Sequence, residues 1–261
     1  MSILIELKRR VLHLTLNRQK KRNALTAEMC STLVDAVAEA QTKPEVGSIL
    51  ISSIGSVFCS GMDLDETSQI SPKALADVHE RLFTMGANSI KPIVVSVNGA
   101  ALGGGLGLAA QGHIVIAGHG AAFGLPEIRV GLWPFLVFRA VEHALGPRRT
   151  LELSLTGRNF HVQDALQWGL VHYVCQTAEL QERADVSARE LAKASPEAIQ
   201  AGLLYFRESR YLQPDESGQL ARKLRAEVMD GLDFKEGYEA FKTRREPHWP
   251  AIPAEFYSER I

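Results

Sequence analysis

The segment from Asn98 to Ala110, with sequence NGAALGGGLGLAA, constrains the fold more than any other part of the chain. It follows a β-branched run at 92–97 that predicts a buried strand, and it leads into small and apolar residues that predict a helix. Consecutive glycines between a strand and a helix indicate a backbone with φ > 0, or one that another group approaches closely. Because the first turn of a helix leaves N–H donors unpaired, this turn can hold negative charge.

Two functions use such a turn: a phosphate cradle, and an oxyanion hole that stabilises charge on a reacting carbonyl. Close packing of a helix on a sheet would also explain the glycines. The run Gly105–Ala110 fits the dinucleotide pattern GxGxxA, and Glu127 follows Gly105 by 22 residues. However, the acid of a dinucleotide site should end the next strand, whereas the strand expected at 113–117 ends in a Gly-His-Gly sequence. The dinucleotide interpretation is therefore disfavoured.

Composition excludes several classes of protein. With 29 Lys and Arg against 30 Asp and Glu, the chain has no overall field that would recruit nucleic acid or an anionic membrane. Its three cysteines lie far apart without metal-ligand spacing, and the sequence contains neither GxxxxGK[ST] nor HExxH. No run of about 18 apolar residues occurs, so we expect a cytoplasmic protein without a metal or membrane partner.

The order of elements predicts an α/β core followed by a helical region. A hairpin is expected at 3–16, then a basic loop at 17–25 that is either solvated or in contact with a ligand phosphate. Helices are expected at about 26–41 and 73–88 with a polar, mobile loop at 65–75 between strand and helix. Further strands are expected at 46–52, 113–117 and 171–174, and helices dominate from about residue 178.

A second turn and one carboxylate complete the chemical candidates. Ser60-Gly61 breaks a strand and frees backbone N–H groups near Met62, and Glu127 lies in an almost wholly apolar stretch. Two N–H donors could hold a carbonyl oxygen while the carboxylate moves a proton, and burial would raise the pKa of Glu127 toward neutrality. Without these turns, we would interpret Glu127 as a solvated or ion-paired residue. Ser60 and the preceding Cys59 lack the context of a nucleophile, so we interpret them as a turn serine and a small buried residue.

At this point the chain resembles the crotonase superfamily, the enoyl-CoA hydratase/isomerase family, along nearly its whole length. Six motifs in the family's order carry the resemblance. They are NRQKKRNAL at 17–25, FCSGMDL at 58–64, NGAALGGGLG at 98–107, FGLPE at 123–127, LTGR at 155–158 with DALQWGLV at 164–171, and FKEG at 234–237 with AF at 240–241.

The resemblance implies a spiral of ββα units over residues 1–195 and a C-terminal helical trimerisation region over 196–261, in a homotrimer or homohexamer. It also implies an acyl-CoA thioester substrate, with coenzyme A as part of the substrate and no separate cofactor. The backbone N–H groups of Met62 and Gly104 would hold the thioester carbonyl, and Glu127 would be the general acid/base. The residues expected to line the substrate site are Arg22, Ala24, Ser60, Gly61, Asp63, Leu64, Gly103, Gly107, Trp133 and Phe135.

Departures from the family pattern refine the expected reaction. Hydratases carry a second glutamate 20 residues before the first, and here that position is Gly107. A lone Glu127 resembles the arrangement of 3-enoyl-CoA to 2-enoyl-CoA isomerases, so isomerisation is favoured. Phe135 stands where dienoyl isomerases have an aspartate, and residues 132–138 lack the usual glycine-rich continuation. The alternatives are a hydratase without its second glutamate and a non-catalytic acyl-CoA-binding member.

Overall fold

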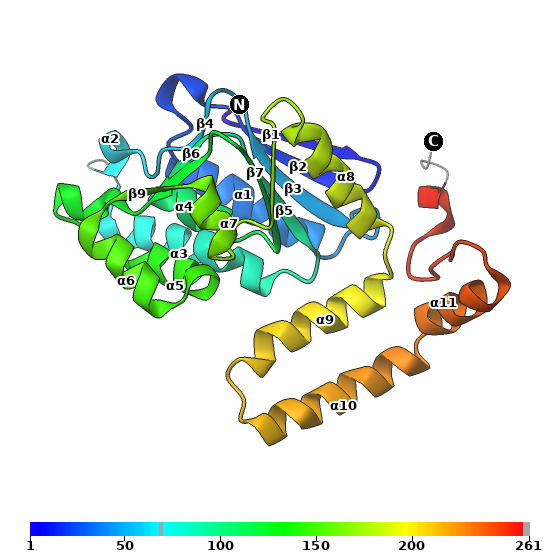
Figure 1. Ribbon diagram of the computed structural model, residues 1–261. Coiled ribbons are helices and arrows are strands. Elements are labelled where there is room, and N and C mark those ends of the chain that lie inside the picture. The colour runs from blue at the N-terminus through cyan, green and yellow to red at the C-terminus, as the bar shows by residue number, and fades with distance from the viewer. Residues whose placement is uncertain (68–69, 258–261) are drawn as a thin grey trace.

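A computed structural model describes residues 1–67 and 70–257 of the 261-residue chain. Its larger sheet begins with an antiparallel hairpin and continues with four parallel strands, because helices or a second strand separate each strand from the next (Figure 1). In sheet order the strands are β1 (Ile3–Lys8), β2 (Val11–Leu16), β3 (Ser48–Ser53), β5 (Ile93–Val97), β7 (Ile114–Gly118) and β10 (Tyr173–Cys175).

A second sheet of short strands runs beside the first and makes the chain a spiral of ββα units. In three successive units, one strand joins the large sheet, the next joins the small sheet, and a helix returns the chain. The small sheet contains β4 (Val57–Cys59), β6 (Ala100–Leu102), β8 (Ala122–Gly124) and β9 (Asn159–His161). The helices of the three units are α3 (Pro72–Asn88), α4 (Gly104–Ala109) and α5 (Phe135–Leu145). The ββα spiral expected from the family resemblance is thus present.

The Asn98-Gly99 pair locks one turn of the spiral onto the previous one. The Asn98 side chain donates to the carbonyl oxygen of Gly55 at 2.7 Å and accepts from the Ser53 hydroxyl at 2.8 Å. A Cβ on Gly99 would lie 2.0 Å from the carbonyl oxygen of Ser56, so no side chain fits there. These contacts fix where β6 and the glycine triplet begin.

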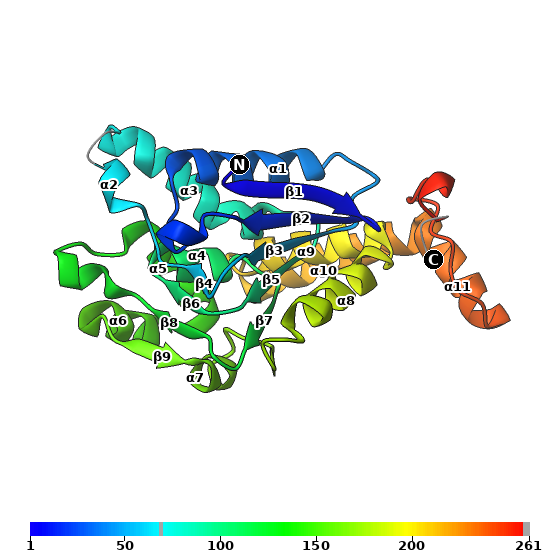
Figure 2. The same cartoon turned by 90° about the horizontal axis from the view of Figure 1, so that it is seen from above.

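Alternate residues of the large sheet face two different hydrophobic layers. Ile49 and Ile51 pack with α1 (Ala27–Ala40) and α3, whereas Leu50 packs with α8 (Leu180–Ala192) on the opposite face (Figure 2). Because the parallel strands are buried on both faces, their sequences are rich in β-branched and aliphatic residues. The Asn98-Gly99 pair therefore follows a fully buried strand, β5, and the short strand β6 separates it from the glycine triplet.

The C-terminal helices extend away from the sheets (Figure 1). They are α9 (Pro196–Ser209), α10 (Pro214–Asp230) and α11 (Leu232–Thr243), followed by a 3-10 turn at Ala254–Tyr257. The buried Asp233 joins this region together, because it accepts hydrogen bonds from the Ser195 hydroxyl at 2.7 Å and the Ala251 amide at 3.1 Å. No helix among the described residues is both long and apolar enough to cross a membrane.

Some local expectations differ from the structure. The polar loop expected at 65–75 begins as a short helix, α2 (Leu64–Thr67), and residues 68–69 lie outside the described part. The strands of the small sheet were not predicted, except for the one broken by Ser60-Gly61, because they are only three residues long and show no alternation. The remaining elements are 3-10 turns at Gln19–Lys21 and Pro126–Val130, α6 (Pro147–Thr156) and α7 (Val162–Gln167).

Candidate active site

The two glycine turns meet at the end of the small sheet. A Cβ built on Gly104 would lie 3.7 Å from the amide nitrogen of Met62, and one built on Gly61 would lie 3.7 Å from the amide nitrogen of Gly104. Across residues 1–67 and 70–257, neither the Met62 amide nor the Gly104 amide donates a recorded hydrogen bond. Two free backbone donors thus stand side by side.

Local structure explains why both donors are free. Leu25 and Met62 form a parallel bridge in which the Leu25 amide donates to Gly61 and the Asp63 amide donates to Leu25, at 2.8 and 2.9 Å. This pairing uses the carbonyl oxygen of Gly61 and the amide of Asp63, and it turns the Met62 N–H away. Gly104 is the first residue of α4, where the helix supplies no acceptor for the N–H.

Glu127 lies against the same helix start. Its Oε1 is 2.9 Å from the place that a Cβ on Gly103 would take, and Gly103 itself has φ of +52°. Its Oε2 is buried and has no hydrogen-bond partner among the described residues. Burial raises the pKa of Glu127 above its ordinary value, because the charged form loses solvation. The carboxyl group is therefore prepared to hold or release a proton nearer to neutral pH.

One helical turn beyond the point where α4 faces Glu127, the surroundings of the helix are apolar. At Gly107, a Cβ would lie 2.8 Å from Cε1 of Phe83 and 2.9 Å from Cγ1 of Val137. These two side chains fill the space into which any side chain at position 107 would project. The packing of α3, α4 and α5 therefore leaves no room for a glutamate side chain at position 107.

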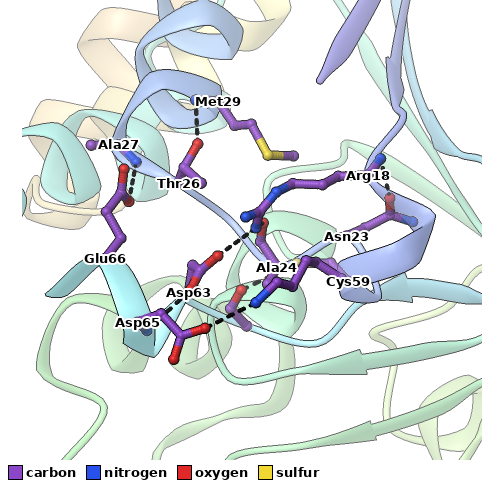
Figure 3. A network of polar contacts seen from close by, with 12 residues as sticks. Arg18, Asn23, Ala24, Thr26, Ala27, Met29, Cys59, Asp63, Asp65 and Glu66 are labelled. Atoms are coloured by element: carbon purple, nitrogen blue, oxygen red, sulfur yellow. Dashed lines mark hydrogen bonds and ion pairs between the residues drawn. The ribbon is translucent and has the colours of Figure 1, made fainter. Parts of the chain in front are cut away.

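A buried polar network holds the Met62 turn in place (Figure 3). The Arg18 guanidinium donates to the Asp63 carboxylate at 2.5 Å and to the Ala24 carbonyl at 3.1 Å. The Asn23 side chain accepts from the Arg18 amide and donates to the carbonyl oxygens of Ile54 and Val57. Arg18 lowers the pKa of Asp63 through this hydrogen bond, so the pair stays ionised.

We expect Arg18→Met to destabilise the fold and to do so less at acid pH. Asp63, whose side chain is only 7% exposed, would lose its cation. Because removing one partner of a buried pair is strongly unfavourable, we expect the free energy of unfolding to fall by about 1–3 kcal/mol. The folded pKa of Asp63 is lowered, so the pair contributes fully above about pH 4 and the contribution is lost as pH falls through the folded pKa. Urea unfolding of both proteins at several pH values measures this difference.

Lys21→Met is the matched control. Lys21 pairs with Asp65 at 2.9 Å, but both side chains are more than half exposed, so the change should be within about 1 kcal/mol. Equal effects of the two substitutions would contradict the role assigned to Arg18.

The other predicted site residues fall into two groups. Arg22, Ala24, Ser60 and Asp63 adjoin the Met62 turn: the Ser60 amide donates to the Arg22 carbonyl at 3.1 Å, and Ala24 is buried beneath it. Gly61 has φ of +107°, which favours glycine at that bend.

The second group lies further from the unpaired amides. Leu64, 56% exposed, opens α2, and Phe135, 74% exposed, opens α5. The Trp133 ring stacks on Phe138 at 6.0 Å rather than on the carboxyl group.

Sequence reasoning missed several residues of the site. Of the basic loop, Arg18 and Lys21 form ion pairs within the chain, which argues against a phosphate-binding role for these two side chains. Phe83 and Val137 gave no local signal, because they reach Gly107 only through tertiary packing. Cys59 is buried and the pKa of its thiol is raised to about 12, which confirms the interpretation as a small buried residue. The described residues contain no group of three or more side chains suited to a metal ion.

Comparison with known proteins shows the family to which the chain belongs. The family model described as enoyl-CoA hydratase/isomerase matches residues 6–251. A probable mitochondrial enoyl-CoA hydratase of Dictyostelium discoideum is 34% identical, over 94% of this chain and 89% of that protein. The 2,3-dehydroadipyl-CoA hydratase of Escherichia coli is 32% identical, over 94% and 97%.

The similarity extends to three-dimensional structure. The crystal structure of human enoyl coenzyme A hydratase domain-containing protein 3 has a TM-score of 0.89 and 27% identity, covering 95% of this chain and all of the other. The match spans both the ββα spiral and the elements that carry Met62, Gly104 and Glu127. The chain is an acyl-CoA enzyme that belongs to the enoyl-CoA hydratase/isomerase family.

Proposed function

We propose that this protein moves the double bond of a 3-enoyl-CoA thioester to give the 2-enoyl-CoA. The observation that carries the proposal is one buried carboxylate, Glu127, beside two unpaired amides, with Phe83 and Val137 closing the position of a second acid. A hydration reaction needs a water molecule held in line for attack, and Phe83 and Val137 present no hydrogen-bonding group for one. Proton transfer by a single acid/base needs no such water.

In the proposed reaction, the thioester carbonyl oxygen accepts hydrogen bonds from the Met62 and Gly104 amides. The Glu127 carboxylate takes a proton from C2, and the electron pair spreads over a dienolate whose negative oxygen these amides stabilise. The protonated Glu127 then donates the proton to C4. The carbonyl and a C2=C3 double bond form together, so that no atom is gained or lost. No metal or separate cofactor takes part.

The substrate site proposed here retains the residues named from the sequence. Arg22, Ala24, Ser60, Gly61, Asp63 and Leu64 surround the first amide, whereas Gly103 and Gly107 form the face of α4 on which the acyl group lies. Trp133 and Phe135 stand on the segment after Glu127, which folds back through a hydrogen bond of 3.0 Å from the Leu132 amide to the Glu127 carbonyl. This segment would cover the acyl group.

Hydration is the second candidate, because relatives such as the Escherichia coli protein are named as hydratases. Absorbance of the conjugated thioester distinguishes the two reactions when 3-enoyl-CoA and 2-enoyl-CoA are offered separately. Isomerisation predicts a gain of conjugation with the first and none lost from the second. Loss of conjugation from 2-enoyl-CoA at a comparable rate would instead establish hydration. Thermal stabilisation by acyl-CoA without either change would indicate a non-catalytic binding protein.

The pH dependence of the rate should report Glu127. Only the ionised carboxylate can take the C2 proton, so kcat/KM should rise with pH through the pKa of Glu127. Since burial raises that pKa, the rise should be centred above the ordinary value of 4.5. A kcat/KM profile that is already flat at pH 4.5 would contradict the assignment. Measuring it with two 3-enoyl-CoA esters of different chain length excludes slow binding as the cause.

We further propose that the protein assembles as a homotrimer or homohexamer. The helices after residue 195 expose large apolar side chains that a single chain leaves uncovered, including Phe206, Leu232, Tyr238 and Phe241. Phe241 alone is 81% exposed. Light scattering during size-exclusion chromatography gives the mass directly, and a monomer at micromolar concentration would contradict this proposal.

A further inference from the structure

A large apolar cavity lies behind the candidate site, between α3, α5 and α9. Its volume is about 500 Å³, it is partly open to solvent, and much of its wall consists of residues with small side chains, whereas Gln111, His113, His143, His172 and Arg210 line the rest. The apolar residues of the wall include Gly86 on α3, Ala110 after α4, Ala140 and Ala144 on α5, and the longer Leu203 on α9. Because these small apolar residues leave room beside Phe83, this part of the cavity could accept a hydrocarbon chain.

The Phe83 side chain stands between this cavity and α4, whose start faces Glu127. On one side its Cζ lies 3.4 Å from the Cβ position of Gly104, and its Cε1 lies 2.8 Å from that of Gly107. On the other side it lines the cavity. The ring is 5% exposed, so it is buried between these two contacts.

The spacing of the glycines along α4 places the Phe83 ring only a few carbons from the reacting end of the acyl group. Gly104 and Gly107, whose Cβ positions both face Phe83, are three residues apart on one face of the helix, and Gly103, the N-cap just before them, faces the carboxyl group of Glu127. One helical turn advances about 5.4 Å, the length of about four carbon–carbon bonds. An acyl chain that has its C2 at Glu127 and runs along α4 therefore meets Phe83 after a few carbons.

We propose that Phe83 sets the length of the acyl group, by closing the acyl site against the cavity behind it. This inference rests on the proposed function, and it assigns short-chain acyl-CoA esters as the substrate class. Longer chains are excluded because the ring occupies their path, not because the protein lacks space for them. Removing the ring joins the acyl site to the cavity.

The test measures binding of saturated acyl-CoA esters, from acetyl to dodecanoyl, to wild type, Phe83→Leu and Phe83→Ala by calorimetry. In wild type we expect affinity to stop rising after a short chain. In Phe83→Ala each further methylene that enters the cavity should strengthen binding about fourfold, while acetyl-CoA binds as before. Phe83→Leu should extend the series by fewer carbons, and it retains more of the packing if the alanine variant is too unstable to fold.

Two matched variants exclude indirect effects. Leu82→Ala removes the neighbouring side chain on α3, which is fully buried but does not line the cavity, so it should lower stability without altering the chain-length series. Adding Ala140→Phe to Phe83→Ala refills the cavity from α5 and should restore the short-chain limit.

The outcomes separate this inference from the proposed function. Saturated esters cannot isomerise, so a shifted binding series supports the role of Phe83 even if turnover assays reveal hydration. An identical series in wild type and Phe83→Ala, or affinity that already rises to dodecanoyl in wild type, overturns it. If no ester binds to wild type or any variant, the assignment of an acyl-CoA site falls, and the role of Phe83 falls with it.

Discussion

Glu127→Gln should reduce turnover of enoyl-CoA by about 10²–10⁴-fold while binding of a saturated acyl-CoA persists. The amide cannot take the C2 proton, but its shape preserves the packing against Gly103, where the Cβ position lies 2.9 Å from the carboxyl oxygen. Steady-state rates and calorimetric binding with the same protein samples separate the two effects. Glu80→Gln, which changes an exposed glutamate on α3, is the control and should leave both unchanged.

The same substitution should stabilise the protein at neutral pH. The pKa of Glu127 is raised in the folded state, so the folded protein binds its proton more tightly than the unfolded chain. Stability from this group is therefore fully present below its unfolded pKa and is lost as pH rises through the folded one. The melting temperature of Glu127→Gln should match wild type near pH 4 and exceed it near pH 7. A variant that is inactive and also less stable at pH 7 would show that Glu127 is a structural residue.

Gly105→Ala should be among the most damaging single methyl additions in the chain. The new Cβ would lie 2.2 Å from the carbonyl oxygen of Cys59, a backbone atom that cannot turn aside. We expect a loss of at least about 3 kcal/mol, because helix α4 must move away from β4. Since β4 leads to Met62 and α4 begins at Gly104, the two amides separate, and an error of about 1 Å in such a site lowers the rate about 10²-fold.

Gly202→Ala is the control for this prediction. Gly202 lies within α9, and nothing stands within 4 Å of the place its Cβ would take. Alanine favours a helix over glycine by about 0.5–1 kcal/mol, so this variant should be slightly more stable than wild type. Opposite signs in urea unfolding would establish that the clash with Cys59, rather than the loss of glycine, causes the effect. A Gly105→Ala protein as stable and active as wild type would contradict the proposed register of α4 on β4.

The residues alone predicted an α/β core followed by helices, and the family resemblance predicted the ββα spiral. The two glycine turns and the carboxylate of the site are marked by local features: Gly61 and Gly103 have positive φ, and Glu127 is a charge in an apolar stretch. Asn98-Gly99 marks a turn in the sequence, although its role in stacking one spiral turn on another depends on Gly55 and Ser56, more than 40 positions away. Such features can be recognised without knowing their partners.

Features that depend on partners distant in sequence could not be predicted. The Arg18–Asp63 pair joins residues 45 positions apart, and the basic loop alone does not reveal that Arg18 points inward. Phe83 and Val137 approach Gly107 from two different helices, and helical periodicity shows only that Phe83 belongs to a buried face. The cavity behind Phe83 appears only when α9 packs near α3 and α5.

The central claim is that Glu127, opposite two backbone amides, is the single group that takes the proton from C2. Incubation of a 3-enoyl-CoA in deuterated water tests it most directly, with mass spectrometry of the residual ester and the product in parallel for wild type and Glu127→Gln. We predict loss of the C2 hydrogen in wild type, seen as conjugated product or deuterium at C2, and neither in Glu127→Gln. Loss of the C2 hydrogen at equal rates in both proteins would contradict the account and assign the proton transfer to another group.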